Sequence, residues 1–104
     1  MNTATLKALA DPSRLKMVEL LREESLTVGE IADRLQLRQP QASKHLRILR
    51  EAGLVEVVPE ANRHRFRVRP EPLMEMNAWL ESFRDMWEGR FEHLSEYLRR
   101  MDRT

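Results

Sequence analysis

Residues 38–49, RQPQASKHLRIL, combine basic and amide side chains with apolar residues at helical spacing. No acidic residue lies between Arg38 and Arg50. Glutamine pairs with adenine, arginine and lysine bind guanine or phosphate, and serine hydrogen-bonds to either kind of group. The stretch therefore favours a surface that contacts a nucleic acid. The alternative is an ordinary helix whose basic face is only solvated.

A helical wheel over residues 40–52 separates the apolar side chains of this stretch from the polar ones. Ala42, Leu46 and Leu49 share one face at i, i+4, i+7 spacing, which predicts the buried side. His45 lies beside that face, so it either packs inward or contacts phosphate. Which of the outward residues read bases and which hold phosphate stays open. The candidate contacts are Gln39, Gln41, Ser43, Lys44, His45 and Arg47.

A second basic run alternates arginines with His64, Phe66 and Val68. A period of two places alternate side chains on opposite faces of a strand. Two β-rich runs, residues 54–59 and 64–68, are therefore predicted to form a two-stranded antiparallel hairpin, or wing, over about residues 54–69. Its tip offers candidates for phosphate or minor-groove contact. These are Asn62, Arg63, His64 and Arg65, whereas Arg67 and Arg69 lie towards the base and are expected to be solvated or paired with acids.

Capping signals predict the helices that precede the basic stretch. Asp11 can cap a helix that begins at Pro12, where a missing N–H costs nothing, and a short helix is expected before it over residues 3–9. Thr27 and Glu30 have capping-box spacing, so another helix is expected to begin there. The expected buried residues are Leu15, Val18 and Leu21 in the first of these two capped helices, with Leu20 as a further candidate, and Ile31, Ala32 and Leu35 in the second.

The basic stretch itself supplies the next helix. Pro40 disfavours helical geometry at Gln39, so Gln39 is the expected cap and Pro40 the first helical residue. Gly53 is suited to the left-handed position that follows a helix end. Two short helices joined by a turn at residues 36–38 predict a helix-turn-helix over about residues 27–52.

The remainder of the chain is predicted to be one long helix over about residues 72–101, after Pro70 and Pro72 end the strand. At roughly 1.5 Å per residue, such a helix is longer than a small domain is wide. Its apolar stripe is therefore expected to meet a second copy of the chain in a homodimer. The expected interface residues are Leu6, Leu73, Met76, Trp79, Leu80, Phe83, Trp87, Phe91, Leu94 and Leu98.

Composition limits the class of protein. The chain has 104 residues, which suits a single domain, and no cysteine, which removes disulfides, thiolate metal sites and cysteine nucleophiles. Neither a glycine-rich phosphate loop nor a catalytic triad can be proposed, so an enzyme is not expected. With no signal peptide or membrane-spanning run in the sequence, a cytoplasmic protein is expected.

The chain resembles the ArsR/SmtB family of small bacterial repressors over about residues 6–69. The resemblance is carried by ALADPSRLKMVELL, LTVGEIADRL and QASKHLRILREAGLV, in that order, followed by a basic hairpin. The tail, with WLESFRDMW and FEHLSEYL, is similar to the SdpR-like branch that lacks known metal sites. The resemblance implies a mainly α winged helix-turn-helix protein with a small β-hairpin. It also implies a homodimer formed through the first and last helices, which binds double-stranded DNA at a pseudo-palindromic operator and represses a promoter, often its own.

The resemblance also bears on cofactors. Metal-sensing members carry cysteines where this chain has Thr27 and Gly29, and others carry an Asp and His pair where this chain has Leu80 and Ser82. No cofactor or metal is therefore expected, and the inducer is left unassigned. Two other functions stay open: a module that binds a protein partner through its basic face, and a metal sensor that uses His93 with Glu96, at i, i+3 spacing.

Overall fold

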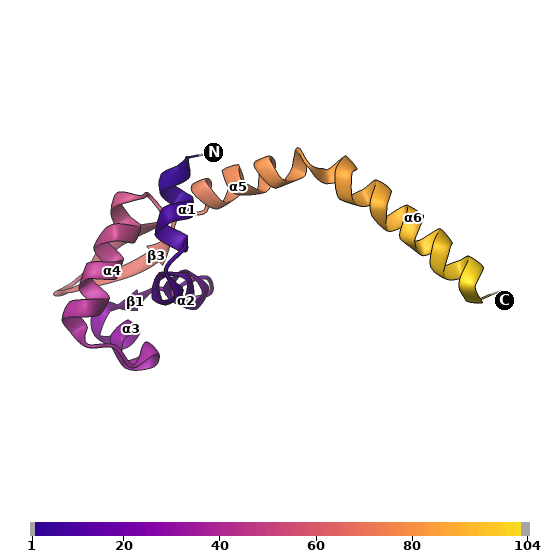
Figure 1. The fold of residues 1–104 in the computed structure, drawn as a ribbon. Coiled ribbons are helices and arrows are strands. Elements are labelled where there is room, and N and C mark those ends of the chain that lie inside the picture. The colour runs from indigo at the N-terminus through magenta and orange to yellow at the C-terminus, as the bar shows by residue number, and fades with distance from the viewer. Residues whose placement is uncertain (1, 103–104) are drawn as a thin grey trace.

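The computed structural model describes residues 2–102, with side chains described for residues 2–89 and 94–101. Figure 1 shows a compact head, which holds residues 3–68, and an extended arm, which holds residues 71–102. The overall dimensions are 67 × 27 × 22 Å. In chain order the elements are α1 Thr3–Leu9, α2 Pro12–Leu20, β1 Leu26–Thr27, α3 Val28–Leu35, α4 Gln39–Glu51, β2 Val55–Glu60, β3 Arg63–Val68, α5 Glu71–Glu81 and α6 Arg84–Asp102.

The core of the head lies where α1, α2, α3 and α4 meet the base of the sheet. Helix α2 contributes Met17 and Val18, and its C-cap contributes Leu21, all of them buried. The prediction that Leu15 belongs to this buried stripe was wrong, because its side chain is 44% exposed and Met17 lies in the core instead. The mainly α fold with a small β-sheet agrees with the sequence-based prediction.

Local capping fixes both ends of the helix-turn-helix. The side chain of Thr27 accepts from the Glu30 amide at 3.3 Å, and Glu30 Oε1 accepts from the Thr27 amide at 3.0 Å, which confirms the capping box. Gly53 adopts φ 77°, and the Leu54 amide donates to the Leu49 carbonyl at 2.9 Å, which closes α4. Both signals act within a few residues of sequence, so they were predictable.

Helix α4 begins one residue earlier than predicted. Arg38 is the N-cap, and Gln39, expected to be the cap, is the first helical residue. The Ala42 amide donates to the Arg38 carbonyl at 3.0 Å, and the Arg38 amide donates to Gln41 Oε1 at 3.2 Å. The side chain of Gln41 thus satisfies a backbone donor that would otherwise be left unpaired at the helix start.

The sheet has three strands in the order β1-β3-β2, rather than the two that the sequence predicted. Leu26 pairs with Phe66 and Thr27 with Arg65, so the central strand β3 is bonded on both sides. Because β1 continues directly into α3, the wing is joined by its backbone to the helix-turn-helix.

The predicted long C-terminal helix is two helices, α5 and α6, which change direction at Ser82 and Phe83. Ser82 Oγ donates to the Trp79 carbonyl at 2.5 Å. The amides of Phe83 and Met86 bond three residues back, to Leu80 and Phe83, at 3.0 Å each. A serine that bonds to its own backbone competes with the helical ladder, and bonds of the i to i−3 type tighten the turn, which accounts for the break.

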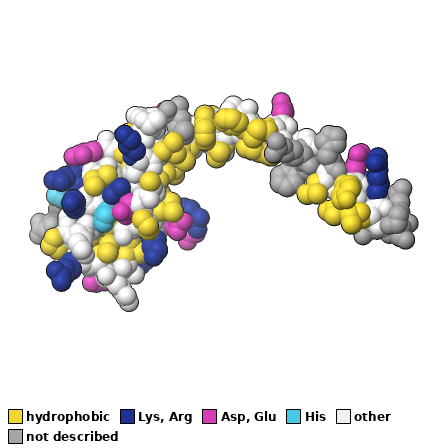
Figure 2. All heavy atoms as spheres, viewed as in Figure 1, with side chains coloured by type: hydrophobic (Ala, Val, Ile, Leu, Met, Phe, Trp, Pro, Cys, Tyr) yellow, Lys and Arg dark blue, Asp and Glu magenta, His cyan; other side chains and the backbone are white. Residues whose placement is uncertain are grey.

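Most apolar side chains of the arm are uncovered. Leu73 packs against the core of the head, but Trp79, Leu80 and Phe83 are 39–44% exposed. Figure 2 shows hydrophobic side chains gathered along the arm beyond the head. Among the other expected interface residues, Met76 and Trp87 are half-buried, and Leu6, Leu94 and Leu98 are exposed, whereas the side chain of Phe91 lies outside the described residues. Across the part of the chain that the structure describes, no helix has the length and apolarity to cross a bilayer.

Candidate nucleic-acid interface

The rotation of α4 is set by its apolar face. Ala42, Leu46 and Leu49 are at most 1% exposed, so this face is locked into the core as the helical wheel predicted. The opposite face is therefore presented to solvent. The residues exposed on α4 include Gln39, Gln41, Ser43, Lys44, Arg47 and Arg50.

His45 lies against α2 instead of pointing to solvent. Its side chain is 22% exposed, and Nδ1 lies 3.4 Å from Arg14 Nη1 and 4.0 Å from Asp11 Oδ1. Asp11 Oδ1 also accepts from the amides of Ser13 and Arg14, at 2.8 and 3.1 Å. The Arg14 amide is the largest cause that lowers the pKa of Asp11, and the charges of His45 and Arg14 add to it. His45 therefore packs against the start of α2, and its contact with phosphate stays a prediction.

The tip of the wing is a two-residue connection, Ala61-Asn62, between β2 and β3. Ala61 adopts φ 53°, in the left-handed region, so the hairpin turns tightly. Asn62, Arg63 and His64 are exposed there. This places three of the four predicted wing contacts at the outer end of the hairpin.

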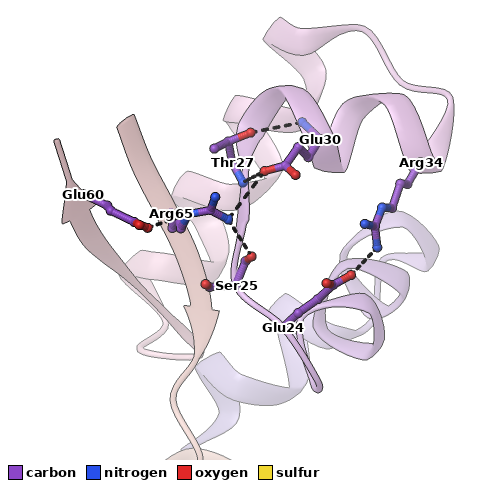
Figure 3. A network of polar contacts seen from close by, with 7 residues as sticks. All are labelled: Glu24, Ser25, Thr27, Glu30, Arg34, Glu60 and Arg65. Carbon is purple, nitrogen blue, oxygen red and sulfur yellow. Dashed lines mark hydrogen bonds and ion pairs between the residues drawn. The ribbon is translucent and has the colours of Figure 1, made fainter. Parts of the chain in front are cut away.

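Arg65, the fourth of these predicted contacts, is partly buried and is held by three groups (Figure 3). Nε lies 2.6 Å from Glu60 Oε2, and Nη1 donates to the Ser25 carbonyl at 3.1 Å and lies 3.7 Å from Glu30 Oε1. Its side chain is 29% exposed. Sequence reasoning could not find these contacts, because Ser25 and Glu30 come from a different part of the chain.

Glu30 connects this network to the start of α3. Its pKa is lowered, first by the hydrogen bond from the Thr27 amide, then by the Thr27 hydroxyl and by the charges of Arg65 and Arg34. In Figure 3, the Arg65 guanidinium lies between Glu60 of the wing and the Thr27–Glu30 capping box. A second ion pair, Arg34 with Glu24, joins the other end of α3 to the segment after α2.

The basal wing arginines are paired with acids, as predicted. Arg67 Nε lies 2.5 Å from Glu56 Oε1. Arg69 Nε lies 3.8 Å from Glu56 and 3.7 Å from Glu71. By contrast, no ion pair with an acid is formed, among the residues whose side chains are described, by Lys44, Arg47 and Arg50 of α4 or by Arg63 of the wing tip.

A groove of about 530 Å³ separates α4 from the wing. It brings together predicted residues from both elements, Ser43 and Arg47 with Asn62, Arg63 and His64. The other predicted residues of α4, among them Gln41 and Lys44, lie outside its lining. Sequence reasoning left out Arg50, which also lines the groove, although its i+3 spacing from Arg47 and the absence of acids from Arg38 to Arg50 were available signals.

Comparison with known proteins places this site in a family. Residues 11–57 match the family described as "Bacterial regulatory protein, arsR family". The regulator Rv2034 of Mycobacterium tuberculosis is 36% identical over 77 residues, covering 74% of this chain and 72% of that protein. The chain belongs to the arsR family. Its fold is accordingly the winged helix-turn-helix, as predicted.

Other matches show how far the likeness extends. The biofilm growth-associated repressor of Agrobacterium fabrum is 41% identical over 63 residues, which cover 61% of this chain. This chain spans only 54% of that protein's length. The solution structure of Mb0332 from Mycobacterium bovis, titled a homodimeric winged helix-turn-helix DNA-binding domain, has a TM-score of 0.66 at 30% identity, covering 80% of this chain and 77% of that one. Proteins named as repressors and one named as a transcriptional activator are among the matches.

The hypothesis of a metal sensor depends on His93 and Glu96, and only one of these two side chains is described. Glu96 is exposed on α6, but the side chain of His93 is not described. Among the described residues, no group of three or more His, Cys, Asp or Glu side chains is placed to hold a metal ion.

Proposed function

We propose that the chain is a transcriptional regulator that binds double-stranded DNA as a homodimer, with α4 in the major groove and the wing tip along the adjacent backbone. One observation carries the proposal: Lys44, Arg47 and Arg63 are exposed without acidic partners, whereas Arg65 and Arg67 are neutralised internally. Exposed cations without internal partners are available to replace the counterions of DNA phosphates.

The dimensions of α4 suit this role. Its 13 residues span about 20 Å, and a major groove about 12 Å wide admits one helix. The Gln41 amide has its oxygen bonded to the Arg38 amide, so its N–H groups remain as donors for a base acceptor or a phosphate. Lys44 and Arg47 lie further along the same exposed face, where guanine or phosphate is the expected partner.

The exposed apolar residues of the arm support a homodimer. Its exposed stripe of Trp79, Leu80 and Phe83 is apolar, and a second copy of the chain would cover it symmetrically. The related Mb0332 domain is described as homodimeric. Two copies of α4 would then read half-sites about one helical turn apart, roughly 10 base pairs, or a small multiple of that.

Repression is the direction of regulation that we propose, through occlusion of a promoter, including that of the protein's own gene. The biofilm growth-associated repressor and the SdpR repressor, both matched by this chain, support this direction. Such a protein acts where the bacterial chromosome lies, in the cytoplasm.

Selection of bound duplexes from a random DNA library tests the proposal. Lys44→Ala and Arg47→Ala are each expected to weaken binding to the selected site at least about tenfold, since each contact is worth about 1–3 kcal/mol. Arg67→Ala is the matched control, because it removes the same charge from an arginine already paired with Glu56. Wild-type affinity in both α4 variants, with the dimer intact, would contradict the proposal.

The salt dependence of binding separates DNA from an acidic protein partner. For duplex DNA, log K should fall linearly with log salt, by about 0.9 for each phosphate neutralised. A comparable affinity for an acidic protein, with no preference among duplex sequences, would favour the protein-binding alternative.

A further inference from the structure

The groove between α4 and the wing has two kinds of lining. Its floor is apolar, formed by Val28, Leu46 and Phe66 from three different elements. Leu46 is buried in the core, while Val28 and Phe66 are partly exposed. Contact with a DNA backbone needs cations and hydrogen-bond donors at a surface, and it leaves an apolar floor of this kind unused.

The rim of the groove is cationic. Arg47 and Arg50 line it from α4 and Arg63 lines it from the wing, and no acidic residue is among its lining residues. These three guanidinium groups form no ion pair with an acid within the described part of the chain. Three uncompensated positive charges above an apolar floor complement a molecule with an anionic group and an apolar body.

The size of the groove fits the same class of ligand. Its volume of about 530 Å³ lies within the range of about 300–1,000 Å³ that is usual for small-molecule sites. The walls come from α4, the start of α3 and β3, and the Arg65 network ties β3 to the start of α3. Two of its walls, β3 and the start of α3, are therefore fixed relative to each other by contacts of the protein itself.

We propose that this groove binds a small aromatic carboxylate, with the ring on Phe66 and Val28 and the carboxylate on the arginines of the rim. Arg47 and Arg63 are also the cations assigned above to DNA, so ligand and DNA exclude each other. This second part rests on the proposed function. The ligand then acts as an inducer that releases DNA through direct competition.

The binding part can be tested without DNA. We would titrate the full chain with 2-naphthoate and follow the backbone amides and arginine Nε–H groups by ¹H–¹⁵N NMR. A probe of this size is expected to bind with a dissociation constant of about 1 mM or tighter. Saturable shifts should centre on Arg47, Arg50, Arg63 and Phe66. The neutral 2-naphthamide and the ring-free acetate should each bind at least about tenfold more weakly.

Substitutions locate the site. Arg50→Gln should raise the dissociation constant of 2-naphthoate at least about fivefold, because it removes a charge-assisted partner. Arg67→Gln removes the same charge outside the groove lining and should leave that constant unchanged. The spectrum of each variant shows directly whether it is folded. Shifts confined to the arm, equal binding of 2-naphthamide, or an unaltered constant in Arg50→Gln would each overturn the proposed site.

The regulatory part uses a selected duplex. At about five times its dissociation constant, 2-naphthoate should weaken DNA binding at least about sixfold by competition, whereas sodium acetate at equal ionic strength should not. Unchanged DNA affinity with 2-naphthoate bound in the groove would overturn the inducer role and leave the ligand site. Binding of 2-naphthoate by a chain that selects no duplex at all would instead overturn the proposed function.

Discussion

Nη1 of Arg65 donates a hydrogen bond to the backbone carbonyl of Ser25 at 3.1 Å, across 40 residues of sequence. With the ion pairs to Glu60 and Glu30, this bond ties the wing to the strand that leads into α3. The position of the wing relative to the start of α3 is therefore set partly by one side chain. Arg65 is thus better explained as a residue that positions the wing than as one that binds phosphate.

Salt-dependent DNA binding distinguishes these two roles. Arg63→Gln should lower the slope of log K against log salt by about 1 per protomer, since it removes a phosphate contact. Arg65→Gln should weaken binding while leaving the slope unchanged, because the wing is misplaced but no counterion-releasing contact is lost. The measurement is fluorescence anisotropy with one selected duplex over a series of salt concentrations.

Arg65→Lys provides the control for charge. Lysine keeps the positive charge but has no planar fork, so it cannot hold Glu60 and Ser25 together. We expect it to bind DNA nearly as weakly as Arg65→Gln does. Wild-type affinity in Arg65→Lys, or a slope lowered by about 1 in Arg65→Gln, would show that Arg65 contacts phosphate directly.

Acid should destabilise the head through Glu30. Its pKa is lowered in the folded state, mainly by the Thr27 amide, so the ionised form stabilises the fold at every pH above the ordinary value of 4.5. That contribution is lost as the pH falls through the lowered pKa. Glutamine at this position can still cap the helix. Glu30→Gln should therefore have a lower Tm than wild type at pH 7.

The difference in Tm between wild type and Glu30→Gln should stay constant down to about pH 5 and shrink below pH 4.5. Thermal unfolding followed by circular dichroism from pH 7 to pH 3 measures it. Parallel Tm profiles over the whole range would mean that the Glu30 charge contributes nothing to stability.

Features that depend on residues close in sequence could be predicted, whereas features that depend on residues far apart in sequence could not. The Thr27–Glu30 capping box and the left-handed Gly53 involve residues three or four apart, so their signals are visible in the sequence. Strand β1 has only two residues, too few to show alternation, and its pairing with Phe66 and Arg65 spans about 40 positions. Such pairing is fixed only when the head packs.

The candidate site divides in the same way. Exposure of Lys44 and Arg47 followed from the helical period of α4. The contacts of His45 and Arg65 could not be predicted from that period, because their partners, the Asp11 carboxylate and the Ser25 carbonyl, are brought close only by packing. The break after α5 was missed for a different reason. Ser82 is compatible with a helix by periodicity alone, and its bond to the Trp79 carbonyl is seen only in the folded chain.

Two glycines offer a matched test of backbone conformation. A Cβ at Gly53 or at Gly29 would meet no atom within 4 Å, so neither substitution creates a steric clash. Gly53→Ala should nevertheless destabilise the protein by about 1–2 kcal/mol, because φ 77° is unfavourable for a residue with a Cβ.

Gly29→Ala, by contrast, lies in the helix α3 and should be stabilising, by up to about 0.5–1 kcal/mol. Urea unfolding of the two variants gives both values at a single protein concentration, which keeps any dimerisation constant. Destabilisation of equal size in both variants would point to packing, and not to backbone conformation, as the cause.

The exposed face of the arm gives the last prediction. Leu80 is 44% exposed beside the edge-on ring pair of Trp79 and Phe83, whose centroids are 5.1 Å apart. If a second copy covers this face, Leu80→Asp would bury a carboxylate without a partner at the interface. The dimer dissociation constant should then rise at least about 100-fold, equivalent to about 2.7 kcal/mol, as measured by sedimentation equilibrium.

Ala78→Asp places the same charge on the opposite side of α5 and should leave that constant nearly unchanged. Monomeric wild-type protein, or equal effects of the two variants, would show that this stripe is not the dimer interface.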